Sequence, residues 1–357
     1  MSPSSPNNIL VRVPNWIGDA VMCLPALMDI RECFVKANIT LLARPTIAEM
    51  LREQCGINDV LVFENQTNHR GVFGLLKLSH IIRKRAFDMA VLFQNAFEAA
   101  VLTSISNIPN RIGYATDGRG WLLSQSVQRP SKRSFHQTQY YQQLVEAVTE
   151  QPSKDRTPKL VVSEKERKAC ESTFPEVFVP SDMLLIGINP GSIYGSAKRW
   201  LPERFAELGD RIVARMFKDH PEYSSVRCLL MGGKGEEDLG REIADRMGSQ
   251  PIVLSGKTSI RELMCILRRC ALLVTNDTGP MHMAQALGVP VVAIFGSTDP
   301  ESTCPSGGEQ VLVCKKVRCA PCLLRACPID HRCMTGVSTD QVMSAVMKQI
   351  EGPFVFS

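Results

Sequence analysis

Phosphate-binding residue types follow an apolar run in the second half of the chain. The segment 189–192 ends Pro-Gly-Ser, and residues 195–202 add Ser, Ala and two adjacent cations, Lys198 and Arg199. Small residues, hydroxyls such as that of Ser192 and neighbouring cations suit a loop that holds a phosphate. The alternative interpretation is a solvated basic loop that only precedes a helix.

A second segment with this character is Thr-Asn-Asp-Thr-Gly-Pro-Met-His at 275–282. A helix is expected to begin near Gly279, and the N–H groups of its first turn would accept an anion. Asp277 could instead cap this helix. His282, on the first turn, suits a structural histidine as well as a site residue.

A third polar segment, Pro-Asn-Trp-Ile-Gly-Asp at 14–19, comes directly after the apolar residues 9–13. Gly18 would let the backbone approach a ligand closely. Asp19 stands at or near a helix start, so a pure N-cap role is the alternative to a role at a ligand.

The glycine-rich turn 232–235 does not complete a dinucleotide fingerprint, because Asp238 occupies the position of its third glycine. It still predicts a turn beside a ligand. Glu236 follows it, and its carboxylate could bind ribose hydroxyls.

The chain has 13 cysteines, most of them inside apolar segments as small buried residues. Cys319, Cys322, Cys327 and Cys333 cluster near the end, with His331 among them. They could hold a structural zinc ion, remain reduced thiols or form redox disulfides.

Length and composition fit a two-domain globular protein. At about 150 residues per domain, 357 residues suggest two domains. The 44% apolar and 22% charged content is ordinary for globular proteins, and no apolar run reaches the ~18 residues of a membrane span. Residues 1–8 do not resemble a secretory signal, so a cytoplasmic protein is expected. The net charge of +5 is too small to indicate duplex DNA, but it fits an anionic small molecule or membrane surface.

Short apolar runs alternate with amphipathic stretches along both halves of the chain. This alternation predicts an α/β fold with two doubly wound parallel sheets, whose ligands bind at the carboxyl ends of strands in a cleft between them. The predicted strands are 9–13, 39–43, 60–63, 89–93, 184–189, 228–231, 252–254, 272–275 and 289–295. The predicted helices are 20–34, 45–52, 72–83, 164–174, 203–217, 236–247, 260–268, 279–287 and 339–350. The expected domains are 1–165, 166–338 with a Cys-rich loop at 304–336, and a C-terminal helix and tail at 339–357.

Taken in order, these segments resemble the bacterial lipopolysaccharide heptosyltransferase family, most closely its members that add the second heptose. The resemblance covers nearly the whole chain. The residues that carry it are Trp16-Ile17-Gly18-Asp19, Pro190-Gly191-Ser192, Ala197-Lys198-Arg199-Trp200, Asn276-Asp277-Thr278-Gly279, Met281-His282 and Gly296-Ser297-Thr298-Asp299-Pro300. Asn95-Ala96-Phe97 and Arg111-Ile112-Gly113-Tyr114 resemble the family's acceptor-side segments.

The resemblance implies a GT-B glycosyltransferase with two Rossmann-like domains facing a central cleft. The N-terminal domain would bind the lipid A–Kdo–heptose acceptor, and the C-terminal domain would bind ADP-L-glycero-β-D-manno-heptose. The transfer inverts the anomeric carbon and requires no cofactor; a structural zinc ion stays an option for the cysteine cluster. The resemblance makes Asp19 the catalytic base and Lys198 the group that stabilises departing ADP. The implied donor residues are Ser192, Lys198, Glu236, Asp277, Thr278, Gly279 and His282, and the implied acceptor-side residues are Trp16, Gly18, Asn95 and Arg111.

Other functions stay open at this point: a GT-B transferase or isomerase for another nucleotide sugar, and a non-catalytic nucleotide-sugar binder. Because the implied acceptor is lipid-anchored, we expect peripheral association with the inner face of the cytoplasmic membrane, and no nucleic-acid partner. The basic residues expected there, which could also be plain surface charges, are Arg83, Lys84, Arg85, Lys132 and Arg133.

Overall fold

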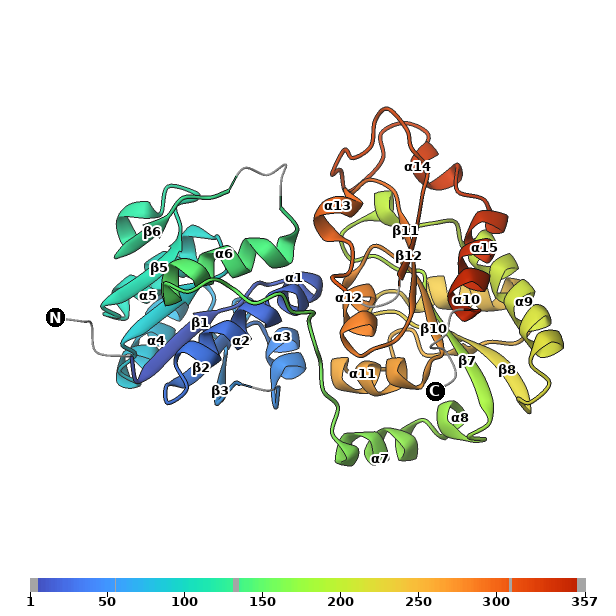
Figure 1. Cartoon of the computed structure of the whole chain (residues 1–357), viewed down its shortest axis with the longest axis horizontal. Helices are drawn as coiled ribbons and strands as arrows, with labels where there is room; N and C mark the ends of the chain where they lie inside the picture. The colour runs from blue at the N-terminus through green and yellow to red at the C-terminus, as the bar shows by residue number, and fades with distance from the viewer. Residues whose placement is uncertain (1–5, 55, 131–134, 308–309, 352–357) are drawn as a thin grey trace. The chain divides into compact units, whose positions relative to one another are not determined.

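The computed structural model describes the chain apart from a few short stretches. The described residues are 6–54, 56–130, 135–307 and 310–351. The chain divides into two compact units, Met1–Val161 and Val162–Ser357. Each contains a six-stranded parallel sheet with flanking helices (Figure 1), so the predicted pair of doubly wound α/β domains is confirmed. Lys132 and Arg133 lie outside the described residues.

The sheet of unit 1 has the strand order β3-β2-β1-β4-β5-β6. Its strands are β1 (Asn8–Arg12), β2 (Asn38–Ala43), β3 (Asp59–Val62), β4 (Met89–Leu92), β5 (Asn110–Tyr114) and β6 (Gln125–Val127). Its helices are α1 (Ile17–Met22), α2 (Leu24–Cys33), α3 (Pro45–Leu51), α4 (Gly71–Lys84), α5 (Phe97–Ile105), η1 (Gly120–Leu122) and α6 (Gln137–Thr149). The chain leaves β1 and β4 toward opposite sides of the sheet. Ligands of such sheets bind at this switch point, beyond the carboxyl ends of the strands.

The sheet of unit 2 repeats this pattern in the order β12-β11-β10-β7-β8-β9. Its strands are β7 (Met183–Asn189), β8 (Ser225–Leu230), β9 (Ile252–Val253), β10 (Leu272–Asn276), β11 (Val291–Phe295) and β12 (Gln310–Cys314). Its helices are α7 (Glu164–Thr173), α8 (Pro175–Phe178), η2 (Ser196–Lys198), α9 (Pro202–Asp219), α10 (Glu237–Arg246), α11 (Ile260–Arg269), α12 (Gly279–Ala286), α13 (Pro300–Thr303), α14 (Arg332–Thr335) and α15 (Thr339–Ile350). Its switch point lies between β7 and β10.

Two predicted segments are wrong in detail. The helix predicted at 20–34 is two helices, α1 and α2, which meet at Cys23. Pro25 lies in the first turn of α2, where its missing N–H is tolerated; inside a continuous helix its ring would clash with a carbonyl one turn earlier. The segment 304–336, predicted as loop, contains β12 and α14, and β12 extends the sheet because it pairs with β11.

None of the helices that the structure describes is both long enough and apolar enough to cross a membrane.

Candidate functional site

A mostly buried ion pair lies at the switch point of unit 2. Lys198 Nζ is 2.6 Å from Asp277 Oδ2, and the two side chains are 13% and 5% exposed. Asp277 follows β10, and its Oδ2 also accepts a hydrogen bond from Thr298 Oγ1 at 2.6 Å. Thr278, not Asp277, is the N-cap residue of α12, so the capping interpretation of Asp277 is wrong. The pair instead fixes an ammonium group where β7 and β10 end.

Side-chain amides hold the Lys198 loop against this edge of the sheet. Asn276 Nδ2 donates to Pro190 O at 2.7 Å, and Asn276 Oδ1 accepts from the Trp200 backbone N–H at 3.0 Å. Asn189 Nδ2 donates to Thr278 Oγ1 at 3.2 Å. The ends of β7 and β10 are therefore bound to each other and to both ends of the loop.

Two buried oxygen atoms beside the loop have no hydrogen-bond partner among the residues that the structure describes. Glu236 Oε2 accepts from Gly233 N at 2.8 Å, but Glu236 Oε1 and Ser192 Oγ have no partner in the described part of the chain. A Cβ at Gly191 would lie only 2.1 Å from Glu236 Oε1, so only glycine allows this approach. Arg199 Nη2 is 4.0 Å from the same Oε1. Burying polar atoms unpaired costs free energy, so we expect a polar ligand to satisfy them.

The first turn of α12 completes this edge. Thr278 makes no capping hydrogen bond with its side chain, so its hydroxyl does not occupy the N–H of Gly279. Of the next two residues, Pro280 has no N–H, and Met281 N donates to Thr278 O at 3.2 Å. His282 lies in α12 and is buried. The structure thus brings all the predicted donor residues to one end of one sheet.

The Cys-rich segment packs on the loop that carries Lys198. Ala197 N donates to Arg325 O at 3.0 Å, and His331 Nε2 lies 3.0 Å from Ala197 O. The Tyr194 ring lies beneath both Lys198 Nζ, at 4.7 Å, and the Arg325 guanidinium, at 5.4 Å. The segment therefore supports the position of the Lys198 ammonium.

The four tail cysteines are not arranged as a metal site. Cys319 and Cys322 are exposed, Cys327 is half-buried and Cys333 is buried. His331 N donates to Cys327 Sγ at 3.3 Å, and burial raises the pKa of the Cys333 thiol. Among the described residues, no three His, Cys, Asp or Glu side chains converge as metal ligands. The structure thus gives the zinc interpretation no support.

At the switch point of unit 1, Asp19 Oδ1 accepts a hydrogen bond from Tyr141 OH at 3.1 Å. Trp16 is the N-cap residue of α1 and Asp19 lies in its first turn, so the interpretation of Asp19 as an N-cap is wrong. Burial and the negative charge of Asp19 raise the pKa of Tyr141 well above its usual value. Tyr141 therefore stays protonated and donates to the carboxylate. No sequence signal joins these residues, because Tyr141 lies on α6, far along the chain.

A buried arginine organises the loop after β4. Arg119 is fully buried and donates to Tyr114 O at 2.9 Å and to Asn95 Oδ1 at 3.3 Å. Asn95 Nδ2 donates to Tyr140 OH at 2.8 Å. Burial lowers the pKa of Arg119, yet backbone carbonyls satisfy its donors. Asn95 thus lies at the same switch point as Asp19, and sequence reasoning missed the arginine that holds it.

Arg111 lies apart from the other predicted acceptor-side residues, which are Trp16, Gly18 and Asn95. It lies near the amino end of β5, at the opposite edge of the sheet. Its guanidinium donates to the backbone carbonyls of Leu122, at 2.7 Å, and Pro109, at 3.2 Å.

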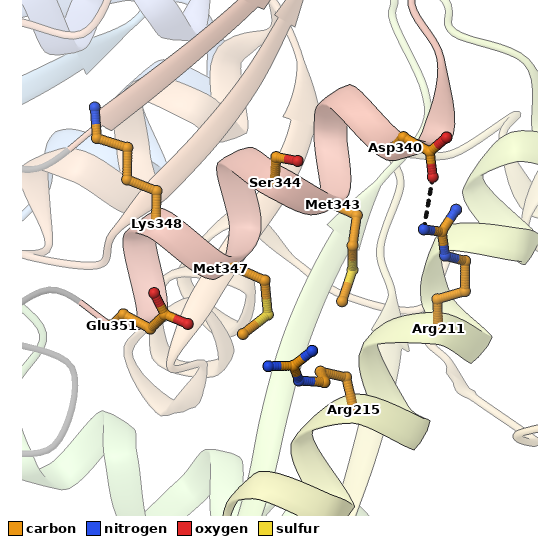
Figure 2. A pocket seen from close by; sticks show the side chains of 8 residues that line it. All are labelled: Arg211, Arg215, Asp340, Met343, Ser344, Met347, Lys348 and Glu351. Carbon is orange, nitrogen blue, oxygen red and sulfur yellow. Dashed lines mark hydrogen bonds and ion pairs between the residues drawn. The ribbon is translucent and has the colours of Figure 1, made fainter.

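A hollow of about 570 Å³ lies elsewhere in unit 2, between α9 and α15 (Figure 2). Figure 2 shows Arg211 of α9 bound to Asp340 of α15. Arg215 pairs with Asp219, which is not drawn in this view. Its arginines are thus neutralised, and it contains none of the predicted site residues. We assign no ligand to it.

Comparison with known proteins shows which family the sequence matches. The sequence matches the model of glycosyltransferase family 9 (heptosyltransferase) over residues 75–332. It is 28% identical to lipooligosaccharide heptosyltransferase 2 of Campylobacter jejuni, covering 95% of this chain and 98% of that protein. It is 27% identical to lipopolysaccharide heptosyltransferase 2 of Salmonella typhimurium, covering 83% and 85%.

Solved structures show the same fold. A family 9 glycosyltransferase from Veillonella parvula has a TM-score of 0.86 at 20% identity, covering 96% of this chain and 97% of that one. The ADP-heptose lipopolysaccharide heptosyltransferase II of Escherichia coli has a TM-score of 0.79 at 23% identity, covering 96% and 98%. The expected GT-B class, with two Rossmann-like domains, is thereby confirmed.

Proposed function

Because the chain belongs to glycosyltransferase family 9, the heptosyltransferases, we propose that it transfers L-glycero-D-manno-heptose from ADP-heptose to the inner core of lipopolysaccharide. The addition of the second heptose is favoured, since the relatives from Salmonella typhimurium and Campylobacter jejuni, covered over 85% and 98% of their length, are named heptosyltransferase 2. In the reaction an acceptor hydroxyl attacks the anomeric carbon from the face opposite ADP. The new C–O bond forms, the bond to ADP breaks, and the configuration inverts.

One observation carries the proposal: the ammonium of Lys198 lies at the switch point of unit 2 together with two buried oxygens that have no hydrogen-bond partner among the described residues. We assign the diphosphate to Lys198, Ser192 and the first turn of α12 at Thr278 and Gly279, which all offer donors to an anion. Glu236 Oε1 would accept a hydrogen bond from the ribose. Asp277 holds the ammonium in place, and His282 lies beside the same turn.

The departing ADP carries the charge that the reaction develops. Lys198 and the Gly279 N–H at the start of α12 are fixed before the reaction, so they stabilise this charge without reorganising. The proposal requires no metal ion, because these groups supply the positive charge. Asp277 next to Lys198 prevents the free enzyme from burying an unpaired cation.

Unit 1 would provide the acceptor side. Asp19 takes the proton of the attacking hydroxyl, and Tyr141 orients the carboxylate through its hydrogen bond. A carboxylate is a weak base, so proton transfer comes late in the attack and catalysis depends mainly on orientation. Trp16, Gly18 and Asn95 lie at the same switch point and would contact the acceptor. Arg111 binds backbone at the other edge of the sheet, so we leave it out of this surface.

The acceptor is a lipid, so we place the enzyme in the cytoplasm, peripherally bound to the inner face of the membrane. Lys84 is exposed on α4, whereas Arg85 pairs with Asp59 and Arg83 donates to Ile105 O. Anionic headgroups would attract such residues.

The substrate assignment is tested by mass spectrometry of products made from ADP-heptose and a panel of truncated core acceptors. We expect addition of one heptose to acceptors that already carry the first heptose. Addition only to acceptors ending in Kdo would show that the enzyme adds the first heptose instead. Transfer from a different nucleotide sugar, in preference to ADP-heptose, would contradict the proposed donor.

Replacing Tyr141 by phenylalanine tests how Asp19 is oriented. Loss of a hydrogen bond to a charged group, worth about 1.5–3 kcal/mol, should lower kcat by about tenfold or more. The acidic limb of the pH–kcat profile should move to higher pH, because the hydroxyl favours the ionised carboxylate. Tyr223→Phe, in unit 2, is the matched control and should change neither quantity. An unchanged pH profile in Tyr141→Phe would make this hydrogen bond merely structural.

A further inference from the structure

Helix α4 has a sharply defined inner face. Its buried residues Gly74, Leu78 and Ile82 recur every four positions and face the core of unit 1. A Cβ at Gly74 would lie 2.3 Å from the carbonyl carbon of His69, so the start of the helix lies directly against the preceding loop. The rotation of α4 about its axis is therefore fixed, and the same residues always point outward.

The outward face of α4 is apolar at its start and basic toward its end. Phe73 is 88% exposed and Leu76 is 49% exposed, and Val72 is exposed beside them. The exposed polar residues that continue this face are Lys77, His80, Arg83 and Lys84. Such a pattern is typical of helices that lie in a membrane interface, with apolar residues inserted and basic ones at the headgroups.

Charge within this helix has one sign, although Asp59 of β3 pairs with Arg85 just beyond its end. Between residues 70 and 85 there is no Asp or Glu. The basic residues in this stretch are Arg70, Lys77, Arg83, Lys84 and Arg85. An anionic membrane surface attracts each Lys or Arg near it. A helix that binds another protein would not require basic residues without any acidic ones.

A second apolar group lies beside α4. Helix α4 packs against α5, and in a parallel sheet both helices start at the carboxyl edge of the strands. Phe97 begins α5, and its ring centroid is 6.5 Å from that of Trp121, which is 76% exposed. Amphipathic Trp rings are enriched at membrane–water interfaces. Asn95, on the proposed acceptor side, immediately precedes this group.

We propose that the outward face of α4, centred on Phe73, Leu76, Lys77 and Lys84, is the surface by which this enzyme docks on an anionic phospholipid bilayer. Phe97 and Trp121 extend it toward the start of α5. The inference rests on the proposed function, because a lipid-anchored acceptor requires the switch point of unit 1 to work at a membrane. Docking at α4 brings that edge of the sheet to the headgroups from which the acceptor projects.

The test is flotation with vesicles of phosphatidylglycerol and phosphatidylethanolamine, compared with phosphatidylcholine alone. The full chain should float with the anionic vesicles, and binding should weaken as salt is raised. Phe73→Ser/Leu76→Ser should reduce binding by about tenfold or more, because two large apolar side chains no longer enter the interface. Lys77→Glu/Lys84→Glu should reduce it by a similar factor and flatten the salt dependence.

Val35→Ser/Phe217→Ser is the matched control, because it removes two exposed apolar side chains elsewhere and should float as the wild type does. All variants should transfer heptose normally to a lipid-free core acceptor, which separates docking from chemistry. A wild type that floats but transfers no heptose would overturn the proposed function and leave the surface intact. Equal flotation of wild type and both α4 variants, or a change in oligomeric state alone, would overturn the surface.

Discussion

Replacing Asp19 by asparagine should lower kcat for heptose transfer by about 10²- to 10⁴-fold, the usual contribution of a general base. The amide keeps the size of the side chain and an oxygen that can accept from Tyr141 OH. The fold should therefore survive, and the melting temperature should stay close to that of the wild type. ADP affinity, measured by calorimetry, should also be unchanged, because the proposed nucleotide site belongs to unit 2.

Asp340→Asn is the matched control for this experiment. Asp340 also lies in the first turn of a helix, α15, but it belongs to unit 2, where it forms an exposed ion pair with Arg211. It should leave kcat unchanged. An Asp19→Asn enzyme with kcat near the wild-type value would remove Asp19 from the chemistry.

Replacing Lys198 by methionine should weaken both binding and turnover. A charge-assisted hydrogen bond is worth about 1.5–3 kcal/mol, so ADP should bind roughly 10- to 100-fold more weakly. If the ammonium also stabilises departing ADP, kcat should fall by a further factor of about 10²–10³. The variant should also be less stable, because the Asp277 carboxylate, 5% exposed, loses its cation.

This loss of stability could itself explain lost activity, and a second variant separates the two effects. Lys198→Met/Asp277→Asn removes the unpaired charge and should recover most of the melting temperature, while Thr298 Oγ1 can still hydrogen-bond the amide. Turnover should stay low in this double variant. Recovery of kcat together with stability would mean that Lys198 only neutralises Asp277.

Most of the fold could be predicted from the sequence, because parallel strands buried on both faces appear as short apolar runs. β7, with every residue buried, begins one residue before the predicted strand. The two elements missed within 304–336 are short: β12 has one apolar stretch, Val-Leu-Val, amid Cys, Pro and Gly. This segment forms a strand because it pairs with β11, and the local sequence gives no sign of that pairing.

Only the part of the site that lies on loops directly after strands could be predicted from the sequence. Because these loops follow neighbouring parallel strands, Ser192, Lys198 and Asp277 lie at one edge of the sheet. The resemblance to heptosyltransferases found in the sequence agrees with the match to the family 9 model. Side-chain partners from distant elements were not predictable. Tyr141 approaches Asp19 from α6, and Arg119 reaches back to Asn95, because tertiary packing alone joins these segments.

The most direct test of the account measures ADP released from ADP-heptose with and without a core acceptor that carries the first heptose. We expect ADP release only with the acceptor, in an amount equal to the heptosylated product. Binding of ADP-heptose without any acceptor-dependent release would indicate a nucleotide-sugar binding protein and would contradict the proposed transfer.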